Sequence, residues 1–132
     1  MKNVIRNKAY LEVLCKSNKS LRTELLQKAT SDQRKALIEV IVNLLNGKIK
    51  LSKNSMQKLT KAKKKLRLIR ELCYDVKRNK IINTNSVRAK SAVVQTGYIL
   101  PFLLIPALIA AGKAAALGAA GISAGINKNG KM

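Results

Sequence analysis

The chain has 132 residues, enough for one domain, and its 27 lysines and arginines against six acids give a formal net charge of +21. Four aromatic residues are too few for base-stacking platforms, which argues against sequence-specific binding of single-stranded nucleic acid. The chain has no histidine, its six acids are scattered and its two cysteines stand far apart, so we expect no catalytic site, no metal site and no cofactor.

The first thirty residues are predicted to form two short helices. Residues 4–15 have the apolar content of an amphipathic helix. After the polar break SNKS, Ser20 is a suitable N-cap for a second helix over residues 21–29. Cys15 and the later Cys73 lie in apolar helical stripes, which is typical of buried free thiols in a reducing compartment. The charged N-terminus lacks the apolar core of a signal peptide, so secretion is not indicated.

The third predicted helix has a clear start and end. Thr30 and Gln33 have the spacing of a capping box, and Asn46-Gly47 is typical of a left-handed helix end. Between them, apolar residues recur with the helical period from 36 to 45, and two further apolar residues widen the stripe. We therefore expect this helix at the centre of a small bundle.

A long basic helix is predicted over residues 53–76, with Ser52 as its N-cap. At the helical period its apolar residues fall within a narrow arc: Leu59, Ala62, Leu66, Ile69 and Cys73. The chain has no acid between Glu39 and Glu71. Ten bases fall in that interval, and we predict that they bind nucleic acid: Lys48, Lys50, Lys53, Lys58, Lys61, Lys63, Lys64, Lys65, Arg67 and Arg70.

Lysines around most of a helix match the phosphate backbone of double-stranded DNA as point charges. They do not read base edges, for which bidentate Arg, Asn or Gln side chains are needed. Two other readings stay open, an anionic membrane surface and a solvated charged surface. A helix-turn-helix is disfavoured because the connector KIKLS is longer than the usual turn.

The composition divides the chain into three parts. Residues 1–76 are predicted to form a basic helical domain, residues 77–97 a mobile linker rich in Asn, Ser and Lys, and residues 98–132 an apolar Gly/Ala-rich tail. Residues 1–97 hold 24 of the bases and all six acids, a net charge of +18. The expected fold class is all-α, a small helical bundle with a long basic helix and an apolar helical tail.

As a helix, residues 98–126 would be about 43 Å long, enough for a bilayer core of about 30 Å. Pro101 and Pro106 should keep the start of this segment out of a regular helix interior, and Lys113 makes insertion costly. We therefore expect a segment that meets a membrane without being a permanent anchor. Its predicted membrane-contacting residues are Phe102, Leu103, Leu104, Ile105, Leu108 and Ile109.

Two segments carry a resemblance. GYILPFLLIPALIAAGKAAALGAAGISAG resembles the C-terminal part of the adenovirus core protein precursors X, from which the basic peptide mu is released. ALIEVIVNLLNGKIKLSKNSMQKLTKAKKKLRLI resembles the small basic proteins of adintoviruses and Maverick/Polinton elements. Together the two segments cover roughly half of the chain, and their order in one chain is what carries the resemblance.

The resemblance implies a virion core protein that condenses packaged double-stranded DNA, located in the virion and the host nucleus. It implies capsid proteins and a viral cysteine protease as partners, with cleavage after Gly97 in VVQTGYIL, where the usual second glycine is absent. The alternative is a tail-anchored or membrane-active basic protein whose body lies in the cytosol.

Overall fold

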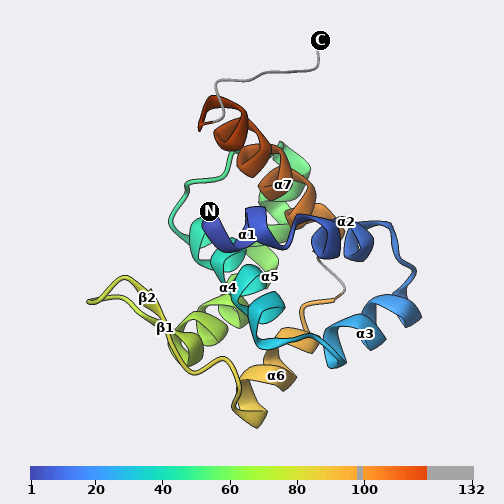
Figure 1. Cartoon of the computed structure of the whole chain (residues 1–132), viewed down its shortest axis with the longest axis vertical. Helices are drawn as coiled ribbons and strands as arrows, with labels where there is room; N and C mark the ends of the chain where they lie inside the picture. Colours follow the sequence, from blue (N-terminus) through green and yellow to red (C-terminus); the bar gives the residue numbers. More distant parts are fainter. Residues whose placement is uncertain (98–99, 119–132) are drawn as a thin grey trace.

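The computed structural model describes residues 1–97 and 100–118, with side chains described at 1–97 and 101–112. Within these residues the chain is mostly helical, with one short hairpin, so the expected all-α class is confirmed (Figure 1). The elements are α1 Lys2–Arg6, α2 Lys8–Lys16, α3 Lys19–Gln27, α4 Ser31–Leu45, α5 Lys53–Cys73, β1 Tyr74–Asp75, β2 Lys80–Ile81, α6 Val87–Val94 and α7 Leu100–Gly118.

The N-terminal helices differ in their bounds from the prediction. The helix expected over residues 4–15 is divided into α1 and α2 at Asn7, whose backbone leaves the helical conformation. Helix α3 begins at Lys19 because Asn18, and not Ser20, is its N-cap. The Asn18 side chain accepts a hydrogen bond of 2.9 Å from the backbone N–H of Leu21.

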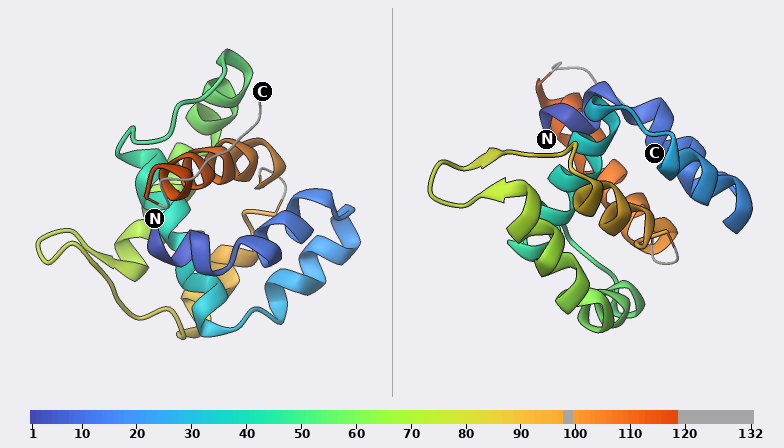
Figure 2. Two further views of the ribbon diagram at one scale, coloured as in Figure 1. Left: turned by 45° about the horizontal axis from the view of Figure 1, so that its top comes forward. Right: turned by 90° about the horizontal axis from the view of Figure 1, so that it is seen from below.

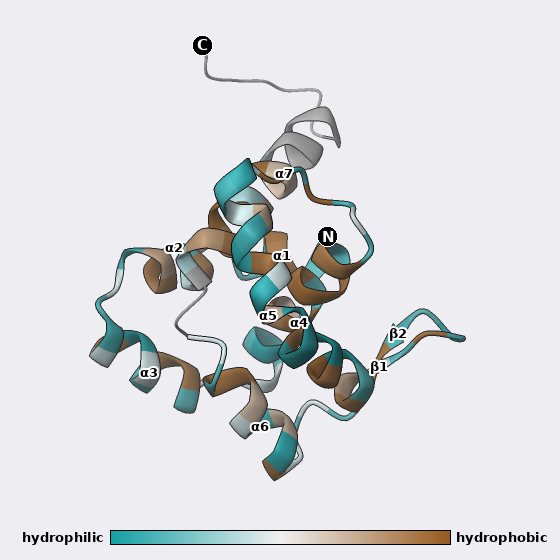
Figure 3. Cartoon of the chain, turned by 180° about the vertical axis from the view of Figure 1, so that it is seen from behind, coloured by the Kyte–Doolittle hydropathy of each residue, from teal (hydrophilic) through white to brown (hydrophobic). Residues whose placement is uncertain are grey.

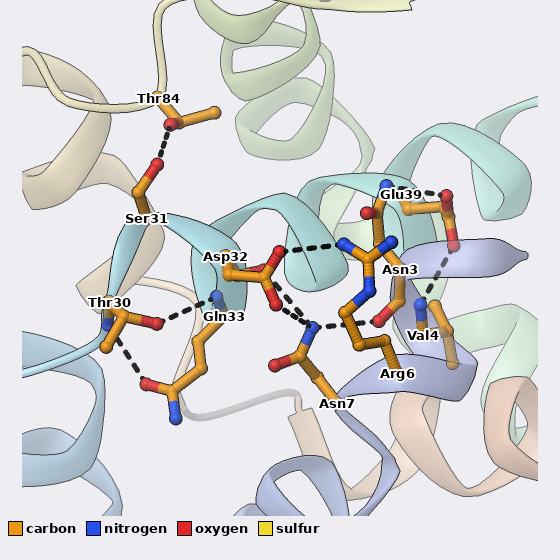
Figure 4. A network of polar contacts seen from close by, with 10 residues as sticks. All are labelled: Asn3, Val4, Arg6, Asn7, Thr30, Ser31, Asp32, Gln33, Glu39 and Thr84. Carbon is orange, nitrogen blue, oxygen red and sulfur yellow. Dashed lines mark hydrogen bonds and ion pairs between the residues drawn. The ribbon is translucent and has the colours of Figure 1, made fainter.

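The predicted caps of α4 and α5 are confirmed. The Gln33 N–H donates to Thr30 Oγ1 over 3.1 Å, and the Thr30 N–H donates to Gln33 Oε1 over 2.9 Å (Figure 4). Gly47 follows α4 with a φ of +71°, a conformation that favours glycine. Ser52 caps α5 by accepting from the N–H of Ser55.

Helices α4 and α5 lie at the centre of the molecule. Nearly the whole inner surface of α4 is buried, as its wide apolar stripe predicted. Helix α5 packs against α4, α6 and α7, and it buries the five residues of its predicted stripe. Helix α7 lies against α1, α2 and α5, whereas α6 lies against α3, α4 and α5 (Figures 1 and 2).

Polar contacts join α1 to α4 on one side of this core (Figure 4). Glu39 accepts two hydrogen bonds of 3.0 Å, one from the Asn3 side chain and one from the backbone N–H of Val4. Asp32 forms an ion pair of 3.1 Å with Arg6 and accepts from Asn7 over 3.0 Å. The hydrogen bond from Asn7, helped by Arg6, lowers the pKa of the Asp32 carboxyl. Two of the six acids therefore hold the N-terminal helix in place.

The prediction of a mobile linker over residues 77–97 is wrong. This segment contains β2, which pairs antiparallel with β1, and helix α6, whose Ala89 and Val93 are fully buried in the core. The connection before α6 is tied down by a buried guanidinium. Arg34 of α4 donates to the backbone carbonyl of Thr84 over 2.9 Å and to the side chain of Asn85. The polar composition of this segment was misleading. Two buried apolar residues, Ala89 and Val93, and the hydrogen bonds from the buried Arg34 are enough to order it.

The described part of the tail is also not a separate segment. Helix α7 buries Leu103, Leu104, Ala107 and Ala111 in the same core as α4 and α5. Contrary to expectation, the helix continues through Pro106. A proline inside a helix has no N–H to donate to the carbonyl four residues earlier, and its ring crowds that carbonyl, so α7 accommodates both effects. No helix among the described residues combines the length and apolarity needed to cross a bilayer. The side chain of Lys113 lies outside the described residues.

Candidate nucleic-acid interface

The basic residues of α5 occupy the sides of the helix that its buried stripe leaves open. Because Leu59, Leu66 and Ile69 are buried, the helix cannot rotate without exposing them, and its orientation is fixed. Hydrophilic residues accordingly dominate the ribbon of α5 in Figure 3. Of the ten predicted DNA-binding residues, Lys63 and Arg70 are half-buried and the others are exposed: Lys48, Lys50, Lys53, Lys58, Lys61, Lys64, Lys65 and Arg67.

Helix α5 itself carries one acid, the exposed Glu71 near its end, and four of the other acids make their contacts elsewhere. Ion pairs join Arg6 to Asp32, Lys28 to Glu24 and Arg78 to Asp75, all outside residues 48–70. Glu39 is directed towards α1 by its hydrogen bonds to Asn3 and Val4. The surface around α5 is therefore strongly electropositive, and a polyanion would lower its self-repulsion.

Part of this basic surface borders an apolar one. The ammonium nitrogen of Lys58 lies 4.7 Å from the centre of the Phe102 ring on α7. Lys48 and Lys50 line an open groove of about 820 Å³ together with residues of α7, including Ile105 and Ile109. Predicted DNA-binding residues and predicted membrane-contacting residues thus share one side of the molecule.

The membrane-contacting set predicted from the tail is only partly exposed. Leu103 and Leu104 lie in the core, so their assignment as membrane contacts is wrong for this fold. Both face the bundle because the helical period of α7 separates them from its outer side. Phe102, Ile105 and Ile109 are exposed, and Leu108 is half-buried.

Gly97 lies in the turn after α6, three residues beyond Val94, and is only half-exposed. Its N–H donates to the carbonyl of Val94 over 3.2 Å, and a Cβ at this position would lie 3.3 Å from a methyl group of Leu26. A glycine therefore suits the close approach of α3. Cleavage after Gly97 stays a prediction, and it would remove the covalent link between α7 and the core in which its side chains are buried.

No family model, curated protein or solved structure matches this chain.

The hairpin adds basic residues that the sequence analysis assigned to a linker. Lys77, Arg78 and Lys80 are exposed on the hairpin, which continues from the end of α5 and extends away from the helices (Figures 1 and 2). The strand pairs place Asp75 opposite Lys80. The turn between the two strands depends on the left-handed conformation of Asn79, which has a φ of +52°. That conformation could not be read from the sequence, so these two-residue strands were not predicted.

The remaining ionisable groups include two free cysteines, Cys15 and Cys73. Among the described residues, no group of three His, Cys, Asp or Glu side chains could hold a metal ion. Burial raises the pKa of the thiols of Cys15 and Cys73, and Glu12 adds to the rise at Cys15. Both thiols are therefore held in the protonated, weakly nucleophilic form.

Proposed function

We propose that this protein binds double-stranded DNA through the phosphate backbone, without sequence preference, and that it condenses the DNA it binds. The observation that carries the proposal is the anchored basic helix α5. Its apolar stripe is buried in the core, while its lysines and arginines occupy the solvent side. The connector before α5 adds the exposed Lys48 and Lys50.

The charge density of α5 suits a duplex. The helix has 21 residues and is about 32 Å long. Double-stranded DNA carries one phosphate per about 1.7 Å of its axis, so a helix of this length lies beside many phosphates. Lysine side chains meet them as flexible point charges. Base recognition in the major groove would instead need bidentate side chains on one helix edge.

Condensation follows from the distribution of charge around the helix. Lys58 and Lys61 lie on one flank of the buried stripe, and Lys63, Arg67 and Arg70 lie on the other. Basic residues on different sides can contact two neighbouring duplexes. The hairpin bases extend the same surface beyond the end of α5.

The resemblance of two segments to adenoviral and adintoviral core proteins supports the virion as the setting of this activity. Under the proposal the protein acts on packaged DNA in the virion and the host nucleus, with capsid proteins and a viral cysteine protease as partners. The membrane-active alternative draws its support from the exposed apolar residues of α7.

A charge-matched pair of variants tests the proposal. Lys61→Gln/Lys64→Gln/Arg67→Gln removes three exposed bases from α5, and Lys8→Gln/Lys19→Gln/Lys90→Gln removes three exposed bases from α2, α3 and α6. The slope of log affinity against log salt is negative, and each lost phosphate contact should reduce its magnitude by about 0.9. The magnitude of the slope should fall by up to about 2.7 for the α5 variant and should change little for the control. Equal losses would assign binding to net charge alone and contradict the proposed interface.

A further inference from the structure

Helix α7 presents a ridge of large apolar side chains to solvent. Phe102, Ile105 and Ile109 are spaced three and four residues apart, so they lie along one side of the helix. Their exposed fractions are 45%, 50% and 66%. The opposite side of the same helix is buried in the core. We call these three residues the α7 ridge.

Lysines flank the α7 ridge on both sides. On one side, Lys48 and Lys50 line the groove of about 820 Å³ with the ridge residues. On the other, Lys16 lines a smaller hollow of about 350 Å³ with Ile105 and Ile109, and one acid, Glu12, lies there too. The Lys58 ammonium over the Phe102 ring brings a further positive charge to the start of the ridge. The apolar strip is thus surrounded mainly by cations.

The positive charge of the chain indicates which kind of partner can bind the α7 ridge. A second copy would bring another +21 against the same lysines and be repelled. Residues 119–132 of the same chain contain Lys128, Lys131 and no acid, so they offer no charge complementarity either. An anionic lipid bilayer offers both an apolar phase and a negative surface. Lysines can place their ammonium groups at headgroup phosphates while apolar side chains enter the acyl boundary.

We propose that the α7 ridge, with its flanking lysines, docks the folded protein on the surface of an anionic bilayer. This site goes beyond DNA binding and does not depend on it. The ridge residues enter only the interface, since α7 remains packed on α1, α2 and α5. Lys48, Lys50 and Lys58 also belong to the proposed DNA interface, so duplex DNA and anionic vesicles should compete for the protein.

The test uses the full chain and vesicles of phosphatidylcholine with or without phosphatidylserine. The protein should sediment with the anionic vesicles. Ile105→Ser/Ile109→Ser should weaken that binding by about tenfold or more, because two apolar side chains no longer enter the interface. Val76→Ser/Val87→Ser is the matched control, since these residues are 70% and 83% exposed on the hairpin and on α6. The control should bind as the parent does.

A fluorescent variant gives a second readout that does not depend on a loss of function. The chain has no tryptophan, so Phe102→Trp introduces a single reporter on the ridge. Its emission should shift to the blue with anionic vesicles, and the emission of Val87→Trp should not. Lys48→Gln/Lys50→Gln should weaken vesicle binding while its circular dichroism stays that of the parent.

Three outcomes would overturn the proposal. The first is equal vesicle binding by the parent and the Ile105→Ser/Ile109→Ser variant. The second is unshifted emission from Phe102→Trp in the presence of anionic vesicles. The third is a parent dimer in sedimentation that the isoleucine substitutions dissociate, which would assign the ridge to a second copy. Normal DNA binding by the isoleucine variant would separate a failure here from a failure of the proposed DNA-binding function.

Discussion

The Lys58 ammonium lies over the ring of Phe102, 4.7 Å from its centre, and so joins the basic helix α5 to the apolar helix α7. These helices come from the two parts of the sequence that differ most in composition. Their packing shows that the apolar segment completes the domain that carries the bases.

The contact between Lys58 and Phe102 should contribute modestly to stability. Both side chains are exposed, and cation–π contacts at exposed sites are worth about 0.5–1 kcal/mol. A double-mutant cycle with Lys58→Gln and Phe102→Ala, measured by urea unfolding, should give a coupling free energy of that size. Strictly additive effects would show that the pair does not interact in solution.

The buried stripe of α5 should be essential for folding. Leu66 is 1% exposed, so Leu66→Asp would place a carboxylate in the core and should cost at least about 3 kcal/mol. Lys64 is exposed, and Lys64→Gln should change stability by no more than about 0.5 kcal/mol. Thermal melts followed by circular dichroism separate the two. Equal melting temperatures for both variants would mean that α5 is not packed.

Removing the tail should destabilise the protein. Without residues 98–132, the sites of Leu103, Leu104, Ala107 and Ala111 would be empty, and the apolar surfaces of α1, α2 and α5 would be exposed. We expect a loss of several kcal/mol on the scale of large core truncations, about 2–5 kcal/mol per large side chain. Deleting only residues 119–132 is the control because it retains α7. Equal urea midpoints for the two truncations would contradict the role of α7 in the core.

The hydroxyl of Tyr10 should lose its proton at a higher pH than an ordinary tyrosine does. Its hydroxyl donates to the carbonyl of Leu25 over 3.0 Å, and burial raises its pKa to about 12, although Arg34 acts in the opposite direction. The neutral form is favoured in the folded state. The stability from Tyr10 is therefore complete below pH 10, the usual pKa, and is lost as pH rises towards 12. Subtracting the tyrosinate absorbance of Tyr10→Phe from that of the parent should give a midpoint near 12. A midpoint near 10 would show that Tyr10 is solvated.

Short-range patterns in the sequence correctly predicted the helix caps, the turn after α4 and the buried side of α5. The capping box at Thr30, the Ser52 cap, the Gly47 turn and the stripe from Leu59 to Cys73 all appear where the residue pattern placed them. Each depends on residues three or four apart along one helix. The bases of α5 were placed on the solvent side by the same argument.

Contacts between distant segments could not be predicted in this way. In the sequence, nothing distinguishes Arg34 from the other basic residues. In the structure it is buried, and its hydrogen bonds hold Thr84 and Asn85, about fifty positions away. The apolar content of the tail indicated a membrane, but the bundle core buries Leu103, Leu104, Ala107 and Ala111 of this segment. Neither outcome follows from periodicity, because both depend on which surfaces the other helices leave uncovered.

Binding of duplex DNA through phosphates is the central claim, and one titration tests it most directly. The full chain is titrated with a random duplex and with several defined duplexes of equal length, each at several salt concentrations. The account predicts equal affinities at each salt concentration and a steep linear fall of log affinity with log salt, with a slope of about −0.9 per phosphate contacted. A shallow slope, or a strong preference for one duplex, would contradict it.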